Sequence, residues 1–245
     1  MIRQLLKLTV LVFFLYSSLV SAQEANTTIT SFNKAKKLLH NEVYFDHRFT
    51  LYCNATYEMD KSVNQPNGFH TDKHVKRSKR IEWEHVVPAE KFGRAFSEWR
   101  DGHAECVSSK GNAFKGRNCA SKMNQDYRLM QADMYNLYPA IGAVNAMRSN
   151  YNFTMIDGEE SDFGSCDMEI DSRKAEPPEI ARGRIARTYL YMDARYPRYN
   201  MSKQTRQLMS AWNKMYPVSD WECERARRIE KVQGNRNAIL SECYK

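Results

Sequence analysis

The spacing of apolar residues predicts helices at both ends of the chain. Residues 31–44 repeat apolar side chains every three or four positions, and Ser31 stands where a helix N-cap is expected. Ser219 and Glu222 have the spacing of a capping box, and Gly234 fits the end of the segment that follows them. Helical spacing marks three segments of the last third, 177–197, 202–217 and 219–235.

The middle of the chain predicts strands and loops. Residues 48–60 alternate and are rich in β-forming side chains, which is typical of a strand. Residues 61–80 are polar and contain a Pro-Asn-Gly turn, so we expect a loop there. Residues 126–153 predict a strand or turn followed by a helix, with Pro139 in the first turn and the helix ending near Arg148.

Residues 80–88 place ionisable side chains inside an apolar strand pattern. The sequence Arg-Ile-Glu-Trp-Glu-His-Val-Val-Pro contains Glu82, Glu84 and His85. Burying a charge is costly unless it is paired or bound to a metal ion. Side chains alternate along a strand, so the two carboxylates share a face and His85 points to the other. For both faces to serve one site, the strand must end, bend or bulge, and Pro88 makes this plausible.

A short helix over 89–99 should lead into a long loop over 100–125. The loop is rich in Gly, Ser, Asn and Lys and contains two cysteines. Loops of this length inside a compact domain are usually functional or disordered. A disulfide within the loop favours a functional one.

The chain holds six cysteines, all beyond residue 22. An even number in an exported chain indicates disulfides, although the sequence cannot choose among the many connectivities. Closing the shortest loops pairs Cys106 with Cys119 and Cys223 with Cys243. Cys53 and Cys166 are then left for each other.

Residues 1–22 have the features of a secretory signal. Two basic residues precede an apolar run over 8–20, and Ala22 fits cleavage after a small residue. We therefore expect a mature chain, 23–245, that forms one domain and is exported to the periplasm or the cell exterior without a membrane anchor. The alternative is an uncleaved N-terminal anchor.

The chain is basic, which points to polyanionic partners. The net charge is +8 and falls to +6 without the signal segment. A basic exported protein is attracted to nucleic acid or to acidic membrane surfaces. Contacts to a phosphate backbone give little sequence preference. The candidates for nucleic-acid contacts are Lys76, Arg77, Lys79, Arg80 and Lys115.

The residue types of the 80–88 stretch suit phosphodiester hydrolysis. This reaction needs a base to activate water, a cation for the developing charge and a second positive group for the phosphate. Histidine is the natural base near neutral pH. Carboxylate and amide oxygens are ligands that Mg²⁺ prefers.

The chain resembles the bacterial endonuclease I family, which are ββα-metal (His-Me finger) nucleases. The resemblance covers roughly residues 31–243 and rests on four segments, 80–89, 127–153, 181–192 and 208–229. It implies an α+β fold with a ββα-metal core and additional helices. It also implies a non-specific endonuclease that cuts double- and single-stranded DNA and leaves 5′-phosphates, with RNA open as a further substrate.

The same resemblance implies a role for each site residue. His85 matches the general base, while Glu84 and Asn136 match the ligands of one divalent ion, Mg²⁺, whose place Mn²⁺ or Ca²⁺ can take. Arg117 matches the residue that stabilises the cleaved phosphate. Lys115 stays open as its alternative, because the register of this loop differs among family members.

Other readings of these residues stay open. Spacing alone makes Glu82 the equal of Glu84 as a ligand. Asn136 taken alone fits a helix N-cap. Asn145, Arg148 and Asn150 either fix a helix end through hydrogen bonds or contact DNA or metal-bound water.

The alternative function is a nucleic-acid-binding protein on a nuclease-like scaffold, because fold does not guarantee activity. The complete set of base and ligand residues favours the enzyme. We expect a monomer.

Overall fold

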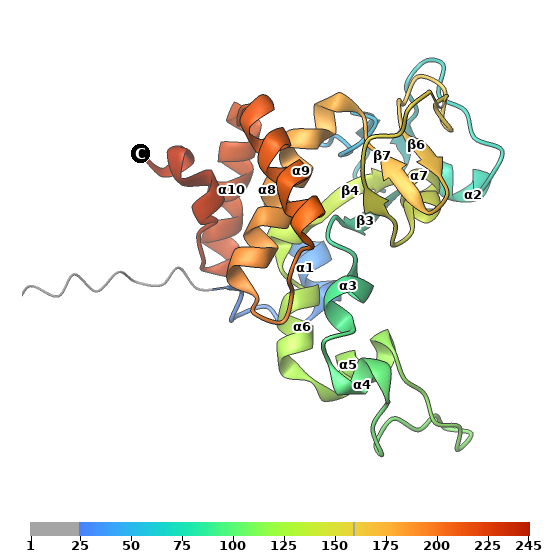
Figure 1. The fold of residues 1–245 in the computed structure, drawn as a ribbon, viewed down its shortest axis with the longest axis vertical. Coiled ribbons are helices and arrows are strands. Elements are labelled where there is room, and N and C mark those ends of the chain that lie inside the picture. Colours follow the sequence, from blue (N-terminus) through green and yellow to red (C-terminus); the bar gives the residue numbers. More distant parts are fainter. Residues whose placement is uncertain (1–24, 159) are drawn as a thin grey trace, which may run out of the picture.

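The computed structural model describes residues 25–158 and 160–245, so the predicted signal segment lies outside the described residues. The architecture is mixed α+β, with helices around small sheets (Figure 1). Within the described ranges, no helix is both long and apolar enough to cross a membrane.

The last third of the chain is helical, as the spacing predicted. The capping box of Ser219 and Glu222 is present, and Gly234 ends its helix in the left-handed conformation with φ 91°. Helices α8 and α9 pack side by side (Figure 1). The elements are α8 Glu179–Arg195, α9 Lys203–Met215, α10 Asp220–Gln233 and the 3₁₀ helix η3 Ala238–Tyr244.

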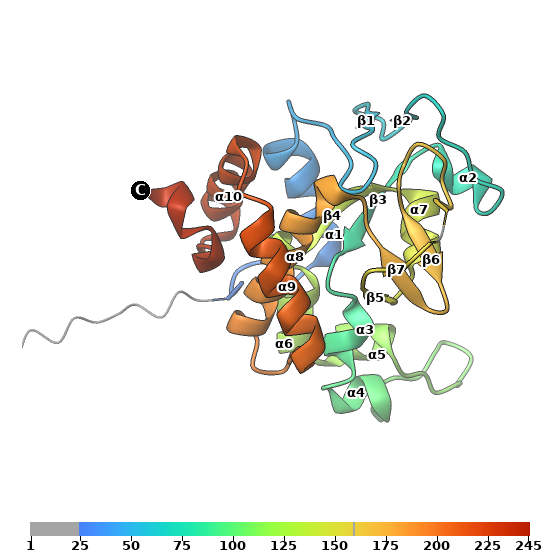
Figure 2. The same ribbon diagram turned by 45° about the horizontal axis from the view of Figure 1, so that its top comes forward.

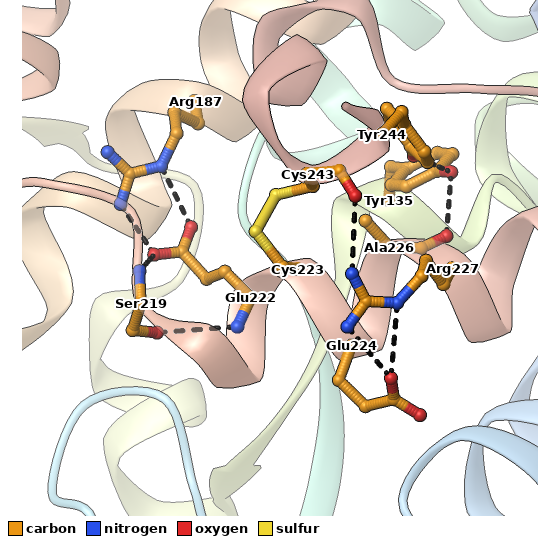
Figure 3. Close-up of a disulfide and its surroundings, with 10 residues drawn as sticks. All are labelled: Tyr135, Arg187, Ser219, Glu222, Cys223, Glu224, Ala226, Arg227, Cys243 and Tyr244. Atoms are coloured by element: carbon orange, nitrogen blue, oxygen red, sulfur yellow. Dashed lines mark hydrogen bonds and ion pairs between the residues drawn. A yellow bond between two sulfur atoms is a disulfide. The ribbon is translucent and has the colours of Figure 1, made fainter.

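One disulfide and one buried ion pair hold this helical layer together. The Cys223–Cys243 disulfide joins α10 to η3. Glu222, at the start of α10, accepts hydrogen bonds from the guanidinium of Arg187 on α8, with Arg187 Nε 2.8 Å from Glu222 Oε1 (Figure 3). Both side chains are buried, so the charge pair links α8 to α10 in the interior of the protein.

The N-terminal helix is present, but the strand predicted over 48–60 is largely wrong. Helix α1 Phe32–Leu38 is capped by Ser31 and continues as the π-helix η1 Leu39–Val43. Past Leu51 the chain turns back on itself, because Asn54 has a positive φ of 48° and Thr50 bonds to Ala55. Only two short strands form here, β1 Thr56–Tyr57 and β2 Val63–Asn64.

A pair of antiparallel strands followed by a helix forms the middle of the molecule. Strand β3 Ile81–His85 pairs with β4 Leu137–Ile141, and α7 Gly142–Arg148 follows directly. The pair lies between the C-terminal helices and the sheet of β5, β6 and β7 in both views (Figures 1 and 2).

The prediction of Pro139 in a helix is wrong, because Pro139 lies in β4 opposite Trp83. Each strand of a two-stranded sheet has an open edge, where a residue without an N–H is tolerated. The carbonyl of Pro139 points to that edge and accepts a hydrogen bond from Leu51 N at 2.8 Å.

The remaining elements are short. The predicted helix over 89–99 forms as two pieces, and the long loop over 100–125 ends in a helix. The helical elements are α2 Val75–Ser78, α3 Ala89–Gly93, α4 Ser97–Arg100, α5 Arg117–Met123, α6 Gln125–Gln131 and the 3₁₀ helix η2 Met134–Asn136. The last sheet has the order β5-β7-β6, with β5 Asn152–Phe153, β6 Glu169–Asp171 and β7 Lys174–Glu176.

The disulfides follow the predicted pairing. Cys106–Cys119 lies within the long loop over 100–125, here called the projecting loop. Cys223–Cys243 joins the C-terminal elements, and Cys53–Cys166 joins segments 113 residues apart. All six cysteines are therefore paired.

Candidate active site

A cavity of about 850 Å³, here called the main cavity, opens beside β3. Residues from α1, β3, α3, α5 and α7 line it, although these elements are far apart in the chain. The lining includes most of the residues singled out by sequence. Its ionisable and amide side chains are Lys36, Lys61, Arg77, Arg80, Glu82, Glu84, His85, Glu90, Arg117, Asn145 and Asn150.

His85 is the last residue of β3 and is held in one tautomer. Its Nε2 lies 2.8 Å from the carbonyl oxygen of Gln131. A carbonyl can only accept, so Nε2 carries the hydrogen and Nδ1 keeps a lone pair. Burial, followed by the positive charge of Arg117, lowers the pKa of His85 to about 3. The imidazole is therefore neutral near pH 7, which is the form that accepts a proton.

The end of the strand at His85 brings both faces of β3 to one cavity. Arg148 donates to the carbonyl oxygens of His85 and Val86, at 3.0 and 2.6 Å. The same guanidinium donates to Glu84 Oε1 at 2.8 Å. One fully buried side chain thus fixes the backbone bend and the carboxylate beside it.

Glu84 is a buried carboxylate with one oxygen committed. Oε1 accepts hydrogen bonds from Tyr52 and Arg148, each at a contact distance below 3 Å. Burial raises the pKa of Glu84, and the Arg148 guanidinium and the Tyr52 hydroxyl oppose that rise. Within the described residues Oε2 makes no hydrogen bond.

The structure argues against the predicted ligand role of Asn136. Its Oδ1 accepts from Val87 N at 2.7 Å, and its Nδ2 donates to Val87 O at 3.0 Å. The side chain is fully buried and does not line the main cavity. Both atoms of the amide therefore serve the backbone that follows β3.

Unlike Asn136, Asn145 lines the main cavity, as Asn150 also does. It lies on α7, where its Nδ2 donates to Glu82 Oε2 at 2.8 Å. Its Oδ1 makes no hydrogen bond within the described chain. From the sequence alone, Asn145 is a candidate for a helix end, for DNA contact or for contact with metal-bound water, but not for a direct ligand. The reason is that β4 was not recognised as a strand and α7 was not placed beside β3.

The oxygens near β3 fit a hard divalent cation. The described residues contain no group of three His, Cys, Asp or Glu side chains that could hold a metal. Mg²⁺ does not need one, because it keeps several waters and binds through one or two protein oxygens. Glu84 Oε2 and Asn145 Oδ1 provide two such oxygens in one cavity.

The cationic candidates divide between the main cavity and the surface. Arg117, the first residue of α5, lines the main cavity, whereas Lys115 lines a separate cavity in the projecting loop. This favours Arg117 as the phosphate ligand. Lys76 and Lys79 are exposed and do not line the main cavity.

Arg77 and Arg80 of the same basic run do reach the main cavity. Arg77 is already paired with Glu82, with Nε 2.8 Å from Oε1. Lys36 and Lys61 add two cations that sequence reasoning missed. They come from α1 and from the turn before β2, so no local pattern marks them.

Comparisons with known proteins identify the family of this chain. The family model of endonuclease I matches residues 19–242. An extracellular deoxyribonuclease of Aeromonas hydrophila is 40% identical over 217 residues, which cover 86% of this chain and 88% of that protein. A periplasmic deoxyribonuclease of the same species is 37% identical, covering 92% and 90%. Endonuclease-1 of Buchnera aphidicola subsp. Acyrthosiphon pisum is 34% identical, covering 95% and 89%. The chain belongs to the endonuclease I family.

Proposed function

We propose that this chain is an exported endonuclease that hydrolyses DNA with His85 as general base and one divalent ion, and that β3, β4 and α7 form its ββα-metal core. The relatives are named extracellular deoxyribonuclease, periplasmic deoxyribonuclease and Endonuclease-1. The observation that carries the proposal is the hydrogen bond from His85 Nε2 to Gln131, which leaves Nδ1 as an acceptor in the main cavity.

His85 performs the proton transfer in this mechanism. Its Nδ1 takes a proton from the attacking water, while the Gln131 carbonyl holds the ring in place and stabilises the imidazolium that forms. The depressed pKa keeps the ring unprotonated before the step. Arg148 positions the backbone of His85, so the imidazole is held in a fixed orientation before the reaction.

Glu84 and Asn145 would hold the divalent ion through the two oxygens that lack other partners. The ion would supply positive charge for the pentacovalent phosphate and for the leaving 3′ oxygen. We expect Mg²⁺, with Mn²⁺ or Ca²⁺ able to take its place. Loss of the bond to the 3′ oxygen leaves a 5′-phosphate on the product.

Arg117, which lines the main cavity, neutralises the charge of the phosphate. Arg80, Lys36 and Lys61 add positive charge along its wall. Charges of this kind bind the sugar-phosphate backbone and carry no base information. We therefore propose a monomeric, non-specific enzyme for double- and single-stranded DNA, with RNA as a further substrate to be tested.

The proposal is tested with purified, oxidised protein and two supercoiled plasmids of unrelated sequence. Nicking with Mg²⁺ and none with EDTA, at scattered positions in both plasmids, is the expected result. Fragments should then accept end-labelling only after phosphatase treatment, because their 5′ ends carry phosphate. A protein that shifts DNA on a gel but never nicks it with any divalent ion would be a binding module instead.

A further inference from the structure

A second cavity, here called the rim cavity, adjoins the main cavity. It has a volume of about 320 Å³ and shares Glu90 and Asn150 with the main cavity. Its other lining residues lie in or directly after α3, at the start of β5 and in the turn between β6 and β7. Figure 2 shows the β5–β7–β6 sheet on one side of the molecule. These other lining residues are Lys91, Arg94, Tyr151, Asn152 and Arg173.

The rim cavity carries uncompensated positive charge. Glu90 is the single acidic residue among those that line it, and it is bonded to Arg94 with Arg94 Nε 2.8 Å from Glu90 Oε1. Lys91 and Arg173 form no ion pair within the described residues. Both are exposed, so two cations face a shared polar hollow without a protein counter-ion.

Arg173 occupies a backbone conformation that does not favour arginine. It lies in the two-residue turn between β6 and β7, where Ser172 has φ 45° and Arg173 has φ 65°. Turns with two positive φ values strongly prefer Asn-Gly. Strained backbone conformations of this kind cluster at active sites and ligand-binding sites. The turn therefore holds a positive charge over the rim cavity at the expense of local stability.

We propose that Lys91 and Arg173 form a subsite for a backbone phosphate of the nucleic acid, adjacent to the phosphate that is cleaved. The inference rests on the proposed nuclease function and extends it to a second contact point. Asn150 lies at the boundary of the two cavities and can donate to the same strand. The main cavity then serves the scissile phosphate, and the rim cavity fixes the strand beside it.

The test compares two double variants in DNA binding. Fluorescence anisotropy of a labelled duplex, in EDTA and across a KCl series, measures affinity without cleavage. Lys91→Ala with Arg173→Ala should bind on the order of tenfold more weakly, and its slope of log affinity against log salt should be shallower by about two. Lys214→Ala with Lys231→Ala removes the same charge from α9 and α10 and should leave the slope unchanged.

Equal slopes for the two double variants would overturn the subsite. A site that serves free phosphate instead of DNA would also overturn it. In that case inorganic phosphate would protect the wild type, but not the Lys91/Arg173 variant, from thermal unfolding, and both proteins would bind DNA equally well. The nuclease proposal fails separately, if wild type binds DNA and never cleaves it with a divalent ion.

Arg173→Gly provides a second test, because it should change thermal stability and DNA affinity in opposite directions. Glycine relieves the positive φ, so the melting temperature should rise while the affinity for DNA falls. A rise in melting temperature with unchanged affinity would show that Arg173 does not bind the strand.

Discussion

Arg148 connects the geometry of the proposed base, His85, with that of the proposed metal ligand, Glu84. It donates to Glu84 and to the carbonyls of His85 and Val86, and it also reaches the hydroxyl of Tyr189 at 3.3 Å. The guanidinium further stacks over a ring, 4.3 Å from the centroid of Phe153. A planar fork with five donors can serve this many partners, whereas lysine cannot. These partners explain why a charged side chain is buried beside the end of β3.

Replacing Arg148 should destabilise the fold strongly. Arg148→Ala leaves Glu84 buried without its counter-ion, which costs about 3–5 kcal/mol. Urea unfolding measures the loss, and Arg94→Ala is the matched control because it breaks an exposed Arg–Glu pair. The control should lose less than about 1 kcal/mol. Equal losses would mean that the buried pair contributes no more than a surface one.

Two asparagines separate metal binding from folding. Asn145→Ala removes a proposed ligand oxygen, so cleavage should need a higher Mg²⁺ concentration while the melting temperature changes little. Asn136→Ala leaves the N–H and C=O of Val87 without partners, at about 1–3 kcal/mol for each buried group. It should therefore lower the melting temperature. The reverse pattern in a Mg²⁺ titration and a thermal melt would return the ligand role to Asn136.

At the scale of elements, local signals predicted helices far better than strands. The helix α10 carries its own start and stop in Ser219, Glu222 and Gly234, so its bounds follow from nearby residues. Strand β4 has no such signal, because its identity depends on pairing with β3 more than fifty positions earlier. Pro139 then appeared to start a helix, and Asn145 on the real helix was not considered as a candidate for direct metal binding.

The turn after Thr50 shows how a disulfide supports the site from outside it. Tyr52 donates to Glu84 at 2.7 Å, and its neighbour Cys53 is bonded to Cys166. The disulfide thus anchors the segment that presents Tyr52. Alternation alone predicted a strand here, and that prediction was wrong. The local pattern does not show that Cys53 is bonded to Cys166, 113 residues later in the chain.

Removing this disulfide should lower activity as well as stability. Cys53→Ser with Cys166→Ser should cost about 2–4 kcal/mol and reduce the cleavage rate at a temperature where the protein stays folded. Cys223→Ser with Cys243→Ser is the control, since that bond lies in the C-terminal layer (Figure 3). The control should lose stability with little change in rate. Similar rates for both double variants would remove the link between Tyr52 and catalysis.

At the scale of the whole molecule, the acid stability of the fold should depend on His85. The unfolded chain binds a proton there near pH 6.5, whereas the folded chain does so only near pH 3. The stability contributed by the neutral ring is complete above pH 6.5 and falls as the pH decreases toward 3. Glu84 and Asp133 act in the opposite sense, because burial raises the pKa of both carboxyls.

His85→Gln should flatten this pH dependence. Between pH 7.5 and 5 the wild type should lose on the order of 2 kcal/mol more than the variant, as measured by urea unfolding at each pH. His103→Gln, an exposed histidine in the projecting loop, should behave like wild type. Parallel curves for wild type and His85→Gln would show that His85 is not buried in its neutral form.

The most direct test of the account is the single-turnover cleavage of DNA by His85→Ala with saturating Mg²⁺, beside His103→Ala. Loss of the general base should slow cleavage by at least about 10²-fold, while DNA binding and the folded state persist. His103→Ala should cleave at the wild-type rate. A folded His85→Ala protein that cleaves within a few-fold of wild type would contradict the histidine-base mechanism.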